Sequence, residues 1–205
     1  MKGKFITFEG SEGSGKSTQA ALVLKYLQDE KVPVTLLREP GGVKISEAIR
    51  NILLDVKSAG IGDECETLLY MAARAQLVKE ALIPALEAGT VVLCDRFLDS
   101  TIAYQGYGNG VDVKVIGQMG AFATKGIKPD LTLLFDIETE RGLARTNAKK
   151  DRIELRSLEY HNQVRQGYLE LARQEPKRIR VITVDKSKEE IFKRVKSLVD
   201  RLLCL

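Results

Sequence analysis

The first residues able to do chemistry form the pattern G-x-x-x-x-G-K-[ST] near the N-terminus. Gly10, Gly13 and Gly15 let backbone N–H groups approach phosphate oxygens closely. Lys16 can reach the β- and γ-phosphates of a nucleoside triphosphate, and the Ser17 hydroxyl can bind Mg²⁺. The pattern predicts a phosphate-binding loop rather than a chance glycine-rich turn. The predicted loop residues are Gly10, Ser11, Glu12, Gly13, Ser14, Gly15, Lys16, Ser17 and Thr18.

Two later apolar runs also end in charged residues. Asp95 and Arg96 follow one of them, and there the carboxylate could hold Mg²⁺ while the guanidinium could bind a phosphate. Arg38 and Glu39 follow the other run. Because ligands of open α/β sheets bind beyond the carboxyl ends of the strands, both pairs could stand near the loop. The alternatives are a surface salt bridge at Asp95 and Arg96, and a plain surface turn at Arg38.

Two further segments carry polar and aromatic side chains. Tyr70 and Arg74 lie four residues apart on a predicted helix, where they could hold a flat ring between them or simply pack. The segment from Ser100 to Gln105 brings three hydroxyls and an amide next to Arg96.

Strands and helices must position these residues, and the sequence alternates between short apolar runs and segments with helical periodicity. The alternation predicts an α/β fold, with a parallel sheet of about five strands covered by helices on both faces. The expected strands are 5–8, 34–37, 91–94, 131–135 and 181–184. The expected helices are 16–30, 45–53, 64–87, 113–122, 138–146, 157–174 and 191–202.

Composition limits the classes of protein to consider. A chain of 205 residues with 44 % hydrophobic content suits one domain over 1–205. The 32 basic and 28 acidic residues are well mixed, which fits anionic small molecules and no nucleic-acid partner. No apolar stretch approaches the ~20 residues of a membrane span, so we expect a cytoplasmic protein with no membrane partner. Its three cysteines lack metal-type spacing and suit reduced thiols.

Taken together, the motifs FEGSEGSGKST, REPGG, DRFLDSTIAYQG, DRIE and GYLELA, with Tyr70 and Arg74 between them, resemble the thymidylate kinase family over nearly the whole chain. The resemblance implies a P-loop NTPase fold and transfer of the γ-phosphoryl of ATP to dTMP with Mg²⁺, giving dTDP and ADP. It also implies a homodimer.

The resemblance assigns roles to individual residues. Glu12 would contact the 3′-hydroxyl of dTMP, Tyr70 would stack on thymine, and Arg74 would bind its O4. Tyr104 would crowd the 2′ position of the sugar, and Thr101 would contact the base. The full set of residues expected to bind dTMP is Glu12, Arg38, Tyr70, Arg74, Arg96, Ser100, Thr101, Tyr104 and Gln105. Mg²⁺ would lie with Ser17 and Asp95.

Some members of the family carry an arginine at the position of Gly13, whereas this chain resembles the bacterial type, in which a basic lid supplies the catalytic cation. Residues 141–156 are the expected lid segment, and a solvated linker is the alternative reading of its polar centre. Our order of preference for the catalytic cation is Arg152, then Arg145, then Lys149, because a guanidinium contacts two oxygens at once. The full set of catalytic candidates is Lys16, Asp95, Arg96, Arg145, Lys149 and Arg152.

Two other functions share parts of this pattern. A kinase of another nucleoside monophosphate, or of a nucleoside, would have the same loop, but Glu12, Arg74 and Tyr104 favour dTMP. A nucleotide-dependent switch protein would carry a guanine-reading N-K-x-D run, which this sequence lacks.

Overall fold

The computed structural model describes residues 3–146 and 150–205. Its strands are β1 (Phe5–Glu9), β2 (Val34–Arg38), β3 (Val91–Asp95), β4 (Leu131–Asp136) and β5 (Ile179–Thr183). Its helices are α1 (Lys16–Asp29), α2 (Lys44–Leu54), α3 (Asp63–Leu77), α4 (Ile83–Glu87), α5 (Leu98–Thr101), α6 (Val113–Ala123), α7 (Thr139–Leu143), α8 (Leu158–Gln174) and α9 (Lys188–Leu203). One 3₁₀ turn (Val56–Ser58) and two π-helical turns (Val78–Leu82 and Ile102–Gly108) complete the described elements.

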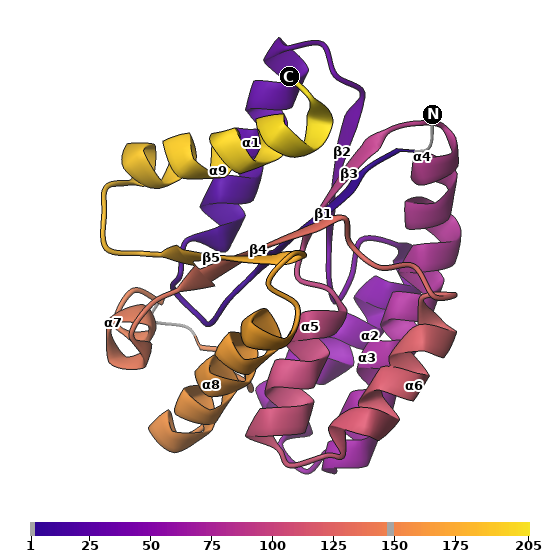
Figure 1. Cartoon of the computed structure of the whole chain (residues 1–205). Coiled ribbons are helices and arrows are strands. Elements are labelled where there is room, and N and C mark those ends of the chain that lie inside the picture. The colour runs from indigo at the N-terminus through magenta and orange to yellow at the C-terminus, as the bar shows by residue number, and fades with distance from the viewer. Residues whose placement is uncertain (1–2, 147–149) are drawn as a thin grey trace.

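The five strands form one parallel sheet in the order β2-β3-β1-β4-β5, with helices on both faces (Figure 1). This confirms the predicted α/β architecture. Phe8 pairs with Asp95, and Asp95 pairs with Arg38, so the carboxyl ends of three neighbouring strands lie side by side. The charged residues that end these strands are thereby gathered at one edge of the sheet.

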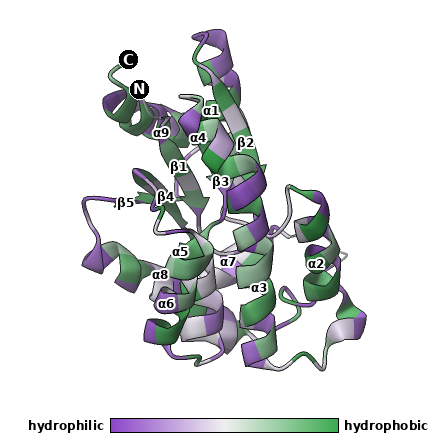
Figure 2. Ribbon diagram, turned by 90° about the vertical axis from the view of Figure 1, so that its right-hand side faces the viewer, coloured by the Kyte–Doolittle hydropathy of each residue, from purple (hydrophilic) through white to green (hydrophobic). Residues whose placement is uncertain are grey.

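Alternating side chains of the strands build a core on each face of the sheet. On one face Ile6 and Phe8 pack with α1 and α9. On the other, Phe5 packs with Phe97 and with the helical segment around Val78. Figure 2 shows hydrophobic residues, in green, along the strands, and hydrophilic residues, in purple, mixed into the helices. Within the described residues no helix is long and apolar enough to cross a bilayer.

Several predicted elements differ from the structure: the expected helix 138–146 already ends at Leu143, and the final helix begins at Lys188 instead of residue 191. The expected helix 64–87 is divided into α3, a π-helical turn and α4, because Pro84 has no N–H to donate and its ring interrupts the regular α-helical hydrogen bonding. The last strand begins at Ile179, two residues earlier than expected, where it pairs with Thr132 of β4. Arg180 is exposed and interrupts the apolar run, which concealed the start of the strand.

Candidate active site

The phosphate-binding loop joins β1 to α1, as its sequence requires. Gly10, Gly13 and Gly15 all have positive φ angles, of 143°, 66° and 80°. At Gly13 a Cβ would also lie 2.0 Å from the carbonyl oxygen of Gly142, the fourth residue of α7. Only glycine meets both requirements, so the loop and α7 touch backbone to backbone.

Lys16 and Ser17 are the first two residues of α1. Lys16 is buried, with its Nζ 3.5 Å from the Ser11 carbonyl oxygen, and burial lowers its pKa. The Ser17 hydroxyl donates to one oxygen of Asp95, while the other oxygen, Oδ1, is buried without a hydrogen-bond partner among the described residues. A hydroxyl beside a carboxylate with a free oxygen fits Mg²⁺, which binds one or two protein oxygens and takes its other ligands from water and phosphate.

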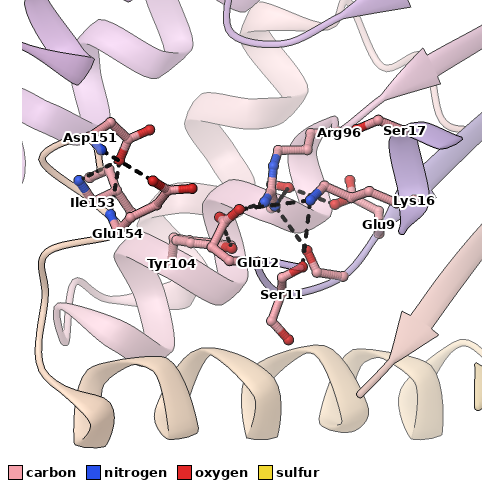
Figure 3. A network of polar contacts seen from close by, with 12 residues as sticks. Glu9, Ser11, Glu12, Lys16, Ser17, Arg96, Tyr104, Asp151, Ile153 and Glu154 are labelled. Atoms are coloured by element: carbon pink, nitrogen blue, oxygen red, sulfur yellow. Dashed lines mark hydrogen bonds and ion pairs between the residues drawn. The ribbon is translucent and has the colours of Figure 1, made fainter. Parts of the chain in front are cut away.

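Arg96 crosses from the end of β3 to the loop (Figure 3). Its backbone has a φ of 71°, unusual for a residue with a side chain. Its Nη1 donates to the Gly10 carbonyl oxygen (3.1 Å), and its Nη2 donates to Glu12 (2.7 Å). The guanidinium also lies 5.0 Å from the centre of the Tyr104 ring. These contacts hold a fixed positive charge at the loop.

Glu12 is the acid whose presence in a phosphate loop needs explanation. It accepts hydrogen bonds from Arg96 and from the Tyr104 hydroxyl (2.8 Å). Burial alone would raise its pKa, but the charges of Arg96 and Lys16 outweigh that effect and lower the pKa to about 2. Glu12 is therefore an anion at neutral pH, and it can accept a hydrogen bond from a substrate hydroxyl.

Glu9 is a buried acid of this site that sequence reasoning missed. One oxygen accepts from the Phe97 backbone N–H (2.7 Å), and the other accepts from the hydroxyls of Ser100 (2.6 Å) and Tyr168 (2.9 Å). Burial, with the nearby charge of Asp99, raises the pKa of Glu9 to about 7. Its place as the last residue of β1, on the same face as Phe5, was the signal available in the sequence.

A cleft of about 250 Å³ runs from the loop to a pocket between α3 and the segment after β3. At its far end Arg74 is 2 % exposed and donates to Glu39 (2.8 Å) and to the Thr101 hydroxyl (3.0 Å). Among the described residues its Nη1 has only the Met71 sulfur as a partner. Tyr70, half-buried, lines the same pocket, as do Ser100, Thr101, Tyr104 and Gln105.

Two arginines line the side of the cleft nearest β2. Arg38 donates to Glu47 of α2 (2.6 Å), and both Arg38 and Arg50 donate to the carbonyl oxygen of Pro40. Arg50 was not among the predicted site residues. Its helical spacing from Glu47, three positions away on the partly exposed face of α2, could have indicated it.

The structure does not place Arg152 at the loop. Its side chain is 6 % exposed, pairs with Glu66 and donates through Nε to the Leu53 carbonyl oxygen (2.8 Å). The order of preference that put Arg152 first therefore has to change. Arg145 is exposed just after α7, and Lys149 lies outside the described residues.

Around Arg152 the chain forms a compact turn. The Asp151 carboxylate accepts from the N–H groups of Ile153 and Glu154 (2.9 Å each), and Glu154 accepts in return from the Asp151 N–H (3.2 Å). Asp151, Ile153 and Glu154 line the cleft on the side away from Ser17 (Figure 3). The turn thus fixes the end of the lid segment against the cleft.

Comparisons with known proteins agree with this geometry. Residues 8–195 match the family model described as thymidylate kinase. The thymidylate kinase of Symbiobacterium thermophilum is 48 % identical over 97 % of this chain and 94 % of its own, and that of Carboxydothermus hydrogenoformans is 47 % identical over 98 % and 99 %. The crystal structure of thymidylate kinase from Ehrlichia chaffeensis superposes with a TM-score of 0.81 at 33 % identity, covering 98 % of this chain and 100 % of the other. The chain belongs to the thymidylate kinase family.

Proposed function

We propose that this chain binds ATP on its phosphate loop and dTMP in the adjoining cleft, and transfers the γ-phosphoryl group between them to give ADP and dTDP. Membership of the family makes the chain an ATP-dependent phosphotransferase, so the proposal concerns which residues perform each step. One observation supports it above the others: Arg96 reaches from the acceptor cleft to the loop and contacts Gly10 and Glu12.

The donor side is the phosphate loop. Backbone N–H groups of the loop and the buried Lys16 would bind the β- and γ-phosphates, with the N-terminus of α1 adding its dipole. The residues proposed to bind ATP are those of the loop, Gly10 to Thr18. Mg²⁺, held with Ser17 and Asp95, would supply positive charge to the phosphate oxygens.

The acceptor side is the cleft between α3 and the segment after β3. Arg38 and Arg96 would bind the phosphate of dTMP, and Glu12 would accept from its 3′-hydroxyl. Tyr104, whose hydroxyl already donates to Glu12, would close the space at the 2′ carbon and disfavour ribonucleotides. No general base is required, because the second pKa of a phosphate monoester is ~6 and the attacking oxygen is already an anion at neutral pH.

The base would lie at the far end of the cleft. Tyr70 would stack on thymine, with Ser100, Thr101 and Gln105 lining the pocket. Arg74 has a donor on Nη1 that no oxygen of the described residues accepts, and this donor suits O4 of thymine. Cytosine would present an amino donor at the same place.

For the catalytic cation we now propose Arg145, with Lys149 as the second candidate. Arg145 follows α7, which touches the phosphate loop through Gly142 and Gly13, and its side chain is exposed. A guanidinium there could reach the transferred group from above the loop. Arg152 is proposed instead to anchor the end of the lid segment.

The test is ADP formation with ATP, Mg²⁺ and each of dTMP, dUMP, dCMP, UMP, dAMP and dGMP. Rapid turnover with dTMP, less with dUMP and little with the others is the expected result. Faster turnover with dCMP or a purine would mean that Tyr70 and Arg74 do not read thymine. ADP formation that no acceptor stimulates would favour a nucleotide-dependent switch.

The same proposal includes a homodimer in the cytoplasm, where ATP and dTMP are available. Exposed apolar side chains stand on two helices that pack against each other: Leu68 of α3 is 57 % exposed, and Val115 and Phe122 of α6 are 45 % and 88 % exposed. Phe122→Ser should convert the dimer to a monomer in analytical ultracentrifugation. A wild-type chain that sediments as a monomer at micromolar concentration would contradict this part of the proposal.

A further inference from the structure

Glu66 of α3 is a fully buried carboxylate shared between the base pocket and the lid segment. One oxygen accepts from the side-chain amides of Gln105 (2.9 Å) and Asn109 (3.0 Å). The other accepts from the guanidinium groups of Arg152 and Arg156. All four partners are donors, and the two arginines offset the cost of burying a carboxylate.

The carboxylate determines which way round the Gln105 amide lies. An ionised carboxylate only accepts hydrogen bonds, so the amide nitrogen of Gln105 must face Glu66. The amide oxygen, Oε1, is then the atom left for a ligand, and within residues 3–146 and 150–205 no group donates a hydrogen bond to it. Gln105 lines the base end of the cleft together with Tyr70 and Arg74.

We propose that Glu66 is a positioning residue that sets base selectivity by holding Gln105 as a hydrogen-bond acceptor toward the base. The inference rests on the proposed function. Thymine presents a donor at N3–H and an acceptor at O4, whereas cytosine presents an acceptor at N3 and a donor at its amino group. An acceptor at Gln105 beside a donor at Arg74 matches thymine at both positions and cytosine at neither.

This role also accounts for the burial of Arg152. Without a guanidinium on its other oxygen, the Glu66 side chain could rotate, and the rotation would free the Gln105 amide to turn. Arg152 holds Glu66 from the side opposite Gln105 and is itself fixed by the Leu53 carbonyl oxygen. The arginine we first expected to meet ATP therefore stabilises the residue that orients the base-reading amide.

The experiment is calorimetric binding of dTMP, dUMP and dCMP to the wild type and to Glu66→Gln. Glutamine keeps the shape but can donate as well as accept, so it no longer fixes the Gln105 amide. We expect the ratio of the dCMP and dTMP dissociation constants to fall at least about fivefold, the lower end of the discrimination of a paired base contact. The ratio for dUMP and dTMP should stay unchanged, because uracil and thymine share N3–H and O4.

A matched control is Glu64→Gln, the same substitution at an exposed position two residues away on α3, which should leave both ratios unchanged. The inference would be overturned if the ratio of the dCMP and dTMP dissociation constants fell less than about fivefold. It would also be overturned if the ratio of the dUMP and dTMP dissociation constants fell by the same factor. Should Glu66→Gln fail to fold, Gln105→Leu is measured in its place. The ratio of the dCMP and dTMP dissociation constants must then fall by a similar factor, and an unchanged ratio overturns the inference. A wild type that does not bind dTMP would instead refute the proposed function.

Discussion

Replacing Glu9 by Gln should remove a large pH dependence of stability. The pKa of this buried acid rises from 4.5 to about 7 in the folded chain, chiefly through burial. Between these two values the folded chain holds a proton that the unfolded chain has released, so the free energy of unfolding falls as pH rises. At 1.36 kcal/mol for each pKa unit, the loss between pH 4 and pH 8 is about 3 kcal/mol.

Glutamine suits the same position. Its carbonyl oxygen can accept from the Phe97 N–H, and the two N–H donors of its amide can reach the hydroxyls of Ser100 and Tyr168, so all three contacts of Glu9 survive without a charge. Urea unfolding of the wild type and of Glu9→Gln, at pH values from 5 to 8.5, measures the effect. Over this pH range the difference in the free energy of unfolding between the two proteins should change by about 2.5 kcal/mol in favour of the variant as pH rises.

The exposed substitution Glu64→Gln serves as the control and should show the wild-type pH dependence. Parallel stability curves for wild type and Glu9→Gln would refute the reasoning, because they would mean that Glu9 does not hold its proton in the folded chain. A steeper decline in the variant would refute it as well.

Three further predictions concern the loop and the lid. Asp95→Asn should raise the Mg²⁺ concentration needed for half-maximal rate roughly tenfold or more, since the orphaned oxygen is lost as a ligand; an unchanged Mg²⁺ titration would remove Asp95 from the metal site. Arg145→Ala should lower kcat roughly 10²-fold with an unchanged Tm, whereas Arg152→Ala should lower stability by about 3 kcal/mol because the buried Glu66 carboxylate loses the nearer of its two guanidinium partners; the opposite pattern in kinetics and urea unfolding would restore Arg152 as the catalytic cation. Gly13→Ala should raise the KM for ATP and lower Tm, since its Cβ would lie 2.0 Å from the Gly142 carbonyl oxygen at a positive φ; wild-type values for both would show that α7 moves away freely.

Local patterns predicted the order of elements and the residues that end the strands. The loop motif predicted the junction of β1 and α1. The predicted ends of β2 and β3 correctly placed Arg38 and Asp95 at one edge of the sheet. These predictions succeeded because the chemistry of each depends on neighbours in the sequence. Tyr70 and Arg74 also line one pocket, as their spacing of one helical turn suggested.

Partners distant in the sequence decided what could not be predicted. Whether Arg152 is free or paired depends on Glu66, which lies 86 positions earlier and looks like any acid of a helical surface until α3 is packed. Glu9 is a similar case, since its titration follows from burial against Ser100 and Tyr168. The basic composition of the lid segment therefore did not show which of its cationic side chains is free to contact the transferred phosphoryl group.

The contact between Gly13 and Gly142 links the residue at position 13 of the loop to the placement of Arg145 after α7. An arginine at position 13 would require α7 to move off the loop, and moving α7 would displace Arg145, the cation proposed to replace that arginine. A Gly13→Arg substitution alone would then displace the lid cation, Arg145, before the arginine at position 13 was correctly positioned. Exchange between the two arrangements should show strong epistasis: each substitution is harmful alone, and only a coordinated set restores the rate. The bare backbone contact thus constrains the evolutionary routes open to this sequence.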